Sequence, residues 1–291
     1  MTENFSYAEF TTRNIGFVTS EDQQRLLGAR VLVIGVGGMG GAAVQALARS
    51  GVGTFAIADI DTFEVSNFNR QVFADLDSLN QSKAQATAAR LRRINPEISV
   101  EVLGAEWRER LDGLLERYPL VINGMDDIAA GIDLYRRARR HGSTVIDAYT
   151  SSLPSVIVVR PADPRPEERL DYPSVGRDPA TLDAGARNGC FTRELEYVLV
   201  HSSSVKYIDM QVAIELIAGK RKRMSFAPMV IATGNLMAFE AVKLILGKPA
   251  ADCRGYFFNP WTMRAEHPLP GWAALPKRFV VRRFLAKMLH A

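Results

Sequence analysis

The stretch RVLVIGVGGMG, residues 30–40, decides the fold of this 291-residue chain. Its first five residues form a short apolar run rich in β-branched side chains, which is typical of a strand buried on both faces of a parallel sheet. Glycines follow at once, and residues 42–49 have the composition of a helix. Glycine lets the backbone approach a phosphate closely, and free N–H groups at a helix N-terminus favour an anion. The stretch therefore predicts a nucleotide-binding loop built on Gly35, Gly37, Gly38 and Gly40.

The alternation of strand-like and helix-like segments continues outward from this stretch. Further strands are expected at residues 55–58, 99–103, 120–123, 144–147 and 155–159. Helices are expected at residues 83–94, 131–141, 207–218 and 231–246. This order predicts an α/β fold, a doubly wound, Rossmann-like and mostly parallel sheet with a C-terminal extension.

The bulk composition is that of a globular protein with a full core. The chain is 47% hydrophobic and 23% charged, and its net charge of +4 is too mild to indicate nucleic acid by itself. Two distant cysteines, Cys190 and Cys253, build neither a disulfide framework nor a four-cysteine zinc site. A polar N-terminus and the lack of a long uncharged apolar run predict a cytoplasmic protein with no membrane partner.

A dense group of polar residues follows the second expected strand. Asp59 closes that strand, where an acid accepts hydrogen bonds from a ribose, and Asp61 lies beside it. Next comes a cluster whose amides can bond phosphate oxygens and whose guanidinium can hold two of them: Ser66, Asn67, Asn69, Arg70 and Gln71. A dinucleotide has no evident need for this charge density, whereas a triphosphate does. For the glycine loop and Asp59, the alternative is a tight structural turn with a solvated aspartate.

Two further charged residues stand at expected element ends. Lys83 opens a helix, so its ammonium and the helix N-terminus could address the same anion. Asp126 follows the strand at residues 120–123, at the edge where open α/β sheets bind ligands, and could hold Mg²⁺ that bridges phosphates. Taken singly, a surface lysine and a helix N-cap made by Asp126 or Asp127 are the better interpretations. Together with the glycine loop, the ligand-binding interpretation is favoured.

These motifs resemble the ubiquitin-activating-enzyme superfamily, whose bacterial members include ThiF, MoeB, HesA and the tRNA threonylcarbamoyladenosine dehydratase. The resemblance covers residues 13–157 and returns at residues 228–247. It implies an enzyme that uses ATP and Mg²⁺ to adenylate a carboxylate and releases pyrophosphate. The implied acceptor is the C-terminus of a small ubiquitin-like or sulfur-carrier protein, or a peptide.

The resemblance also implies roles for individual residues. Gly38 approaches the phosphates, Asp59 the ribose, and Asp126 binds Mg²⁺. Phosphate oxygens and the developing charge are held by Asn67, Asn69, Arg70 and Lys83. Arg13 matches an N-terminal arginine that is supplied across a homodimer interface, although an arm arginine is usually just solvated. The expected parts are an N-terminal arm (1–28), an ATP-binding core (29–160), an irregular crossover loop (161–190) and a C-terminal part that completes the domain (191–291).

The chain departs from the superfamily at its cysteines. Members similar to ThiF and MoeB carry two CxxC pairs that bind zinc, and none occurs here, so zinc is not expected. Cys190 stands roughly where some members use a cysteine after adenylation, but it could equally be a buried apolar residue. The basic run at residues 220–223 could touch RNA or an acidic tail, and a solvated helix end is the more frequent explanation.

Three other functions stay open beside the carboxylate adenylyltransferase. One is a tRNA-modifying dehydratase of the same superfamily, with nucleic acid as a possible but not favoured partner. Another is an NAD(P)-dependent oxidoreductase, which Asn67, Arg70 and Lys83 count against. The last is a nucleotide-binding protein without turnover.

Overall fold

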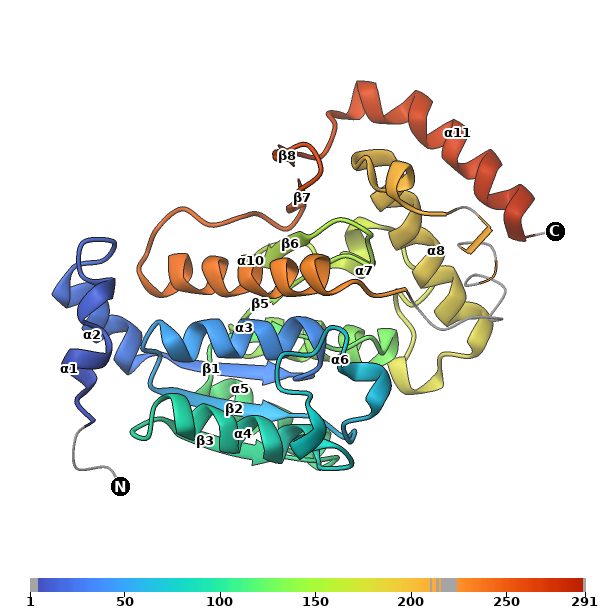
Figure 1. Cartoon of the computed structure of the whole chain (residues 1–291). Helices are drawn as coiled ribbons and strands as arrows, with labels where there is room; N and C mark the ends of the chain where they lie inside the picture. Colours follow the sequence, from blue (N-terminus) through green and yellow to red (C-terminus); the bar gives the residue numbers. More distant parts are fainter. Residues whose placement is uncertain (1–4, 210, 213–214, 216–223, 290–291) are drawn as a thin grey trace.

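The computed structural model describes residues 5–209, 211–212, 215 and 224–289. Its centre is an eight-stranded sheet in the order β3-β2-β1-β4-β5-β6-β7-β8 (Figure 1). The strands are β1 (Arg30–Ile34), β2 (Thr54–Ala58), β3 (Ser99–Leu103), β4 (Leu120–Asn123), β5 (Thr144–Asp147), β6 (Ser155–Val159), β7 (Tyr256–Asn259) and β8 (Arg264–Glu266). The first five are parallel, and β6, β7 and β8 are antiparallel to their neighbours. The predicted fold class is thereby confirmed.

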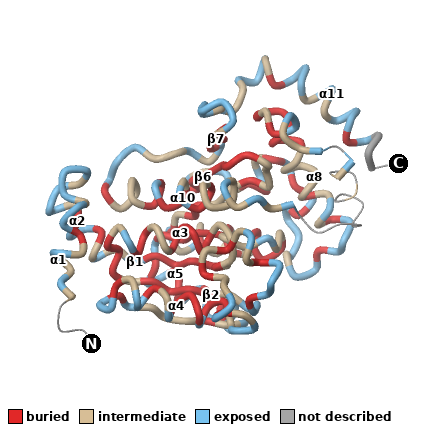
Figure 2. The backbone as a smooth tube through the Cα atoms, viewed as in Figure 1, coloured by how far each residue is buried: buried red, intermediate tan, exposed pale blue. Residues whose placement is uncertain are grey.

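Helices cover both faces of the sheet, and each face has its own apolar core. One core joins the sheet to α2 (Ser20–Gly28), α3 (Gly38–Arg49), α4 (Lys83–Ile94) and α10 (Ala227–Ile245). The other joins it to α5 (Trp107–Arg117), α6 (Ile128–Arg140) and α8 (Ala184–His201). Figure 2 shows the buried chain concentrated along the sheet and the inner helix faces. Strands such as β1 are apolar throughout because both of their faces are covered.

The remaining helices lie at the ends of the chain and in the crossover. The α-helices are α1 (Tyr7–Phe10), α7 (Pro166–Arg169) and α11 (Gly271–Leu289). The 3₁₀ turns are η1 (Thr12–Asn14), η2 (Val65–Asn67), η3 (Leu76–Ser78), η4 (Pro179–Thr181) and η5 (Ser204–Tyr207). α11 packs along α8 and leaves its other side exposed (Figures 1 and 2).

Two expectations about local structure need correction or stay open. Residues 161–190 are not irregular throughout, because α7 begins with Pro166, a position where proline is compatible with a helix, and α8 begins at Ala184. The expected helix at 207–218 and the basic run at 220–223 lie largely outside the described residues. α5, α8, α11, β7 and β8 were not anticipated.

α10 is the one described helix whose length and composition alone would let it cross a membrane. It instead lies directly beside α3, where Gly234 permits close contact. A Cβ at Gly234 would come within 2.4 Å of the Met39 carbonyl oxygen and 2.6 Å of the Ala42 side chain. The side of the helix that includes Met237 and Ala241 belongs to the core. Only 33% of this apolar stretch is buried, so packing in the helical layer explains part of the apolar composition of α10.

Candidate functional site

The predicted site residues gather around one groove of about 840 Å³ at the carboxyl ends of β1, β2 and β4. The chain leaves β1 toward β2 and β3 on one side, and reaches β4 and β5 on the other. The loops after β1 and β4 consequently diverge, which opens a crevice at this edge of the sheet. Predicted residues that line the groove are Gly35, Gly37, Gly38, Asp59, Asp61, Ser66, Asn67, Arg70, Gln71, Lys83 and Asp126.

The glycine loop is shaped by contacts that exclude a side chain. Gly35 has φ +83°, and a Cβ there would come within 2.6 Å of the Gly124 carbonyl carbon. Gly40 lies beneath the groove, where a Cβ would meet the Gly35 carbonyl oxygen at 1.9 Å. Gly37 is the N-cap of α3, and no described side chain caps that helix. The first N–H groups of α3 are therefore available to an anion in the groove.

Asp59 holds the glycine loop in place. Its carboxylate accepts hydrogen bonds from the N–H of Val36 at 2.9 Å and from the N–H of Asp61 at 3.0 Å. Burial raises the pKa of Asp59, against the lowering effect of these hydrogen bonds and of Lys83. The side chain lines the groove, so the same carboxylate also faces the space where a ribose is expected.

Lys83 lies at the start of α4 and forms an ion pair across the groove loop. Its Nζ is 2.9 Å from Oδ2 of Asp61, and its side chain is only 9% exposed, against 62% for Asp61. The Lys83 N–H also donates to the Asp61 carbonyl at 2.9 Å. Lys83 is thus not a solvated surface lysine, and the exposed Asp61 balances its charge.

Arg70 is oriented by its own neighbours. Its Nη1 donates to the Ser66 carbonyl at 2.7 Å and to Oδ1 of Asn69 at 2.9 Å. Asn69 donates in turn to the Ser225 carbonyl at 3.1 Å, just before α10, and is not among the residues that line the groove. Asn69 therefore acts on the site by fixing Arg70 and by tying this loop to α10.

Asn67 and Gln71 have different surroundings. Oδ1 of Asn67 accepts the N–H of Glu64 at 3.0 Å, so this buried amide caps the η2 turn. Gln71 is 7% exposed and its side chain lies beside Gly37. Its Oε1 has no hydrogen-bond partner among the described residues. A buried acceptor without a partner is costly, so Gln71 is a candidate to receive a donor from a ligand.

Asp126 offers a free carboxylate to the groove. In the part of the chain that the structure describes, it has no hydrogen-bond or ion-pair partner, and no cluster of three metal-binding side chains occurs. Its neighbour Asp127 instead caps α6 through the N–H of Ala130 at 3.0 Å and lies 3.5 Å from Arg108. One carboxylate suits Mg²⁺, which completes its shell with waters and phosphate oxygens.

Parts of the groove were not found from the sequence. Arg108 enters from the start of α5, which the apolar spacing of Trp107, Leu111, Leu114 and Leu115 could have revealed. Another wall comes from α10 and includes Val230 and Thr233. A Cβ on Gly38 would approach the Val230 side chain to 2.5 Å. No local pattern predicts this contact between segments so far apart in the chain.

Two predicted catalytic residues lie away from the groove within this chain. Arg13 is exposed on the N-terminal arm, whose Asn14 donates to the Ser50 carbonyl at the amino-end side of β2, the opposite edge of the sheet. Its supply across a dimer interface stays a prediction. Cys190 lies on α8 and faces the core, where it is 0% exposed. Burial raises the pKa of its thiol. The geometry favours a structural role for Cys190.

Comparison with known proteins gives many relatives with substantial identity, and two of them illustrate the range of their functions. One is the sulfur carrier protein ThiS adenylyltransferase of Escherichia coli, 34% identical over 113 residues, which are 38% of this chain and 45% of the relative. Another is the tRNA threonylcarbamoyladenosine dehydratase of Haemophilus influenzae, 33% identical over 130 residues, which are 44% of this chain and 50% of the relative. The matched part of the chain thus spans about half the length of these relatives.

The fold also occurs among solved structures. The structure of Escherichia coli MccB with succinimide has a TM-score of 0.63 at 18% identity, over 91% of this chain and 72% of the other. That likeness concerns the fold alone. The model of the ThiF family matches residues 11–271, which includes the whole sheet and every residue of the groove. The chain therefore belongs to the ThiF family.

Proposed function

We propose that the protein is an ATP- and Mg²⁺-dependent adenylyltransferase that converts a carboxylate into an acyl adenylate. The observation that carries the proposal is the composition of the groove. An uncapped helix N-terminus and the cations Arg70, Lys83 and Arg108 surround a space with one unpaired carboxylate, Asp126. This combination suits a triphosphate with a divalent cation better than it suits a dinucleotide.

In the proposed reaction, a carboxylate oxygen of the acceptor attacks the α-phosphorus of ATP. A new P–O bond forms, the bond between the α-phosphorus and the bridging oxygen breaks, and pyrophosphate leaves with the electron pair. The attacking carboxylate is already an anion, so no general base is needed. The residues of the groove act by holding the reactants in line and by neutralising phosphate charge.

Individual side chains have distinct tasks in this proposal. The N–H groups at the start of α3 and the guanidinium of Arg70 bind phosphate oxygens, and Asp59 accepts the ribose hydroxyls. Lys83 exchanges part of its pairing with Asp61 for the phosphates. Asp126 would hold Mg²⁺, which would screen the charge of the pyrophosphate as it leaves.

The acceptor belongs to one of two classes. A sulfur-carrier or ubiquitin-like protein, or a peptide, is our first choice, in keeping with a relative that adenylates the carrier ThiS. The second candidate is activation of threonylcarbamoyladenosine in tRNA, because a dehydratase for that nucleoside is similar over a comparable length. We expect a cytoplasmic homodimer in either case, with Arg13 as the residue that a partner subunit would supply.

The test is ATP–pyrophosphate exchange with radiolabelled pyrophosphate, measured with carrier proteins, peptides and modified tRNA as separate acceptors. We expect exchange that requires Mg²⁺ and one acceptor class. Arg70→Ala should lower it at least tenfold, because the guanidinium contacts phosphate. Arg117→Ala is the matched control, since Arg117, at the end of α5, pairs with Glu101 of β3 and neither residue lines the groove.

Binding measurements separate this proposal from the oxidoreductase. Titration of the protein with ATP plus Mg²⁺ and, separately, with NADH should give binding for ATP alone. Tight NADH binding without ATP binding would overturn the adenylyltransferase. ATP binding without exchange for any acceptor class would favour a nucleotide-binding protein that has lost turnover.

A further inference from the structure

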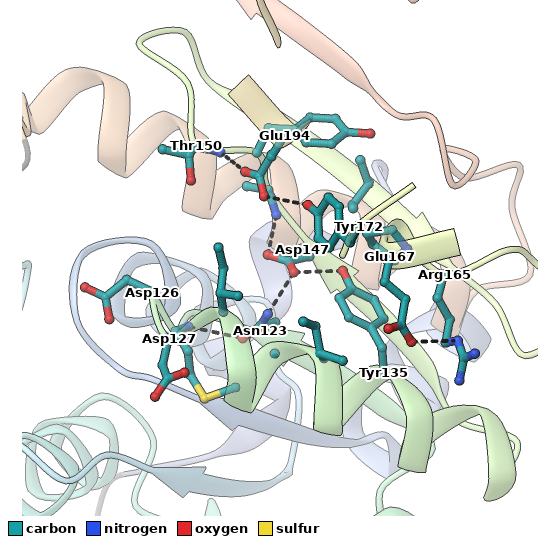
Figure 3. A pocket seen from close by; sticks show the side chains of 18 of the residues that line it. Asn123, Asp126, Asp127, Tyr135, Asp147, Thr150, Arg165, Glu167, Tyr172 and Glu194 are labelled. Carbon is teal, nitrogen blue, oxygen red and sulfur yellow. Dashed lines mark hydrogen bonds and ion pairs between the residues drawn. The ribbon is translucent and has the colours of Figure 1, made fainter. Parts of the chain in front are cut away.

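A second, smaller cavity of about 80 Å³ lies beside the groove (Figure 3). Its walls come from β5, α6, α8 and the crossover segment, by which we mean the chain between β6 and α8. The two spaces share a wall formed by Met39, Met125, Asp126, Asp127 and Tyr149. The cavity therefore begins where the reacting carboxylate and the metal are proposed to meet. It has room for the end of one side chain.

The acid at the centre of the cavity is Asp147, the last residue of β5. One of its oxygens accepts hydrogen bonds from the hydroxyl of Tyr135 and the amide of Asn123, each at 2.7 Å. The other accepts only the N–H of Ala148 at 2.7 Å within the described chain, so it retains capacity for a further donor. Asp147 keeps some accessible surface where it lines the cavity.

A second acid, Glu194, comes from α8 and faces the same space (Figure 3). Its two oxygens accept the N–H of Thr150 at 2.5 Å and the hydroxyl of Tyr172 at 3.1 Å. The charge of Glu194 adds to burial, the main cause, in raising the pKa of Asp147 to about 7. Two carboxylates that face one cavity disfavour each other's ionisation unless a cation or a shared proton lies between them.

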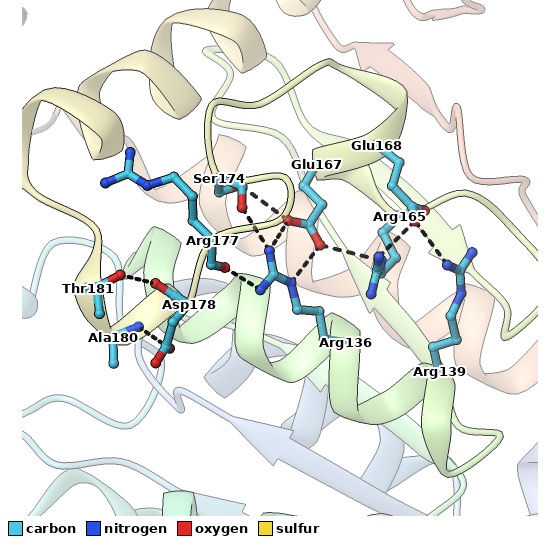
Figure 4. A network of polar contacts seen from close by, with 10 residues as sticks. All are labelled: Arg136, Arg139, Arg165, Glu167, Glu168, Ser174, Arg177, Asp178, Ala180 and Thr181. Atoms are coloured by element: carbon cyan, nitrogen blue, oxygen red, sulfur yellow. Dashed lines mark hydrogen bonds and ion pairs between the residues drawn. The ribbon is translucent and has the colours of Figure 1, made fainter.

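Apart from Asp126 in the shared wall, the other charged residues around the cavity are already paired. Glu167 accepts two hydrogen bonds from Arg136, at 2.9 and 2.7 Å, and lies 3.4 Å from Arg165 (Figure 4). Arg165 also contacts Glu168 at 2.7 Å. This network fastens the crossover segment to α6 and leaves no lining arginine directed at Asp147 or Glu194. The unbalanced charge in the cavity is negative.

We propose that this cavity is an acceptor pocket, in which Asp147 and Glu194 bind the amino group of the residue that carries the reacting carboxylate. The proposal rests on the adenylyltransferase function and names its substrate class, an amino acid or peptide C-terminus with a cationic amino side chain. An ammonium offers three N–H donors to the carboxylate oxygens of Asp147 and Glu194 and supplies the missing positive charge. A carrier tail that ends in glycine has no side chain and would leave the cavity unfilled.

The test is calorimetric titration of the full-length protein, without nucleotide, with four peptides Ala-Ala-Ala-X, where X is lysine, ornithine, norleucine or glycine. We expect lysine or ornithine to bind at least tenfold more tightly than norleucine and glycine. Norleucine is the matched probe for lysine because it keeps the stem and lacks the charge. Asp147→Asn and Glu194→Gln should each remove this preference for a cationic side chain. The weak affinity for the glycine peptide should stay unchanged in both variants.

Control variants and a nucleotide titration keep the outcomes separate. Asp133→Asn removes an acid from α6 that pairs with Arg137 outside the cavity, and should bind like the unaltered protein. Thermal unfolding checks that each variant is folded. The inference is overturned if all four peptides bind within twofold of each other, if neither cationic peptide binds, or if the preference survives both cavity substitutions. ATP binding, measured separately, tests the proposed function and does not depend on this result.

Discussion

The groove and the cavity occupy adjacent positions at one edge of the sheet, yet they differ in charge and in origin. The groove presents Arg70, Lys83 and Arg108, whereas the cavity presents Asp147 and Glu194. The groove combines its three cations with carboxylates such as Asp59 and Asp61, whereas no cation of the described chain faces the acid pair of the cavity. Cations on one side of Asp126 and this acid pair on the other suit the two ends of an acceptor that carries both a reacting carboxylate and an amino group. In the proposed reaction, this edge of the sheet would separate the side that binds phosphate from the side that binds the acceptor.

The largest expected effect concerns the stability of the cavity wall. Glu167→Ala leaves Arg136, whose side chain is 22% exposed, without its bidentate partner, which is itself 3% exposed. Removal of one member of a buried pair costs about 3–5 kcal/mol of unfolding free energy. Urea denaturation measures this loss. Glu168→Ala is the control, because that glutamate is 31% exposed and its removal should cost no more than about 1 kcal/mol. Equal losses would mean that the network does not hold the crossover segment.

The next effect concerns Asp126, which lies in the wall shared by the groove and the cavity, and its expected role in exchange. Asp126→Ala should reduce ATP–pyrophosphate exchange by about 100- to 1000-fold, because the metal would lose its protein ligand. The fold should persist, since Asp126 has no partner among the described residues. Asp133→Ala on the neighbouring helix is the control and should retain full exchange. Unchanged exchange in Asp126→Ala would remove this residue from the site.

The third effect is the contribution of Asp147 to the pH dependence of the unfolding free energy. Because burial raises the pKa of Asp147 to about 7, the folded protein keeps a proton that the unfolded chain has already lost between about pH 4 and pH 7. The unfolded state therefore binds fewer protons at Asp147, and the contribution of Asp147 to stability falls by about 2 kcal/mol between pH 5 and pH 7. Burial lowers the pKa of His201 to about 4, which gives an opposing contribution over the same range. The effect of Asp147 is therefore the difference in slope between the unaltered protein and Asp147→Asn.

Urea denaturation at pH 5, 6 and 7 measures both slopes. Asp147→Asn should remove the contribution of Asp147, because the amide does not titrate, and should become the more stable protein near pH 7. Asp133→Asn should keep the slope of the unaltered protein. Equal slopes in Asp147→Asn and the unaltered protein would assign the proton to another group.

The smallest expected effect comes from a substitution in the apolar core, outside both the groove and the cavity. Cys190→Ala should leave ATP–pyrophosphate exchange within twofold, because the thiol is fully buried and lines neither space. Its removal from the core should cost about 1 kcal/mol of stability. A loss of exchange beyond tenfold in a folded variant would restore Cys190 as a candidate for chemistry.

The groove was largely predictable from the sequence because its parts are local. The glycine loop, Asp59 and Lys83 each stand at the end of an element whose apolar pattern marks it, and parallel strands bring such ends to one edge. Arg108 was missed with the helix that carries it. The hydrogen bond between Asn69 and Ser225 joins residues 156 positions apart, which no local pattern reveals.

The cavity, in contrast, could not be predicted. Asp147 was recognised only as the end of a strand, and Glu194 belongs to a helix that was not anticipated. Asp147 and Glu194 come together because the chain between β5 and α8 folds back on itself. The Thr150 N–H donates to Glu194 of α8, 44 positions further along the chain. Tertiary contacts of this kind depend on buried ion pairs such as that of Arg136 and Glu167. They produce no periodic pattern of residues from which they could be predicted.

The wall that α10 contributes to the groove has a consequence for synthesis on the ribosome. When the chain has emerged only as far as β6, the parallel strands and the glycine loop exist, but Val230 and Thr233 have not been made. Domains form as their segments become available, in N-terminal to C-terminal order. A nascent chain at that stage exposes the face of α3 that Gly234 will later cover. If the groove binds nucleotide as proposed, tight binding requires the chain to be complete through α10, so a ribosome-stalled truncation before α10 is expected to bind nucleotide poorly.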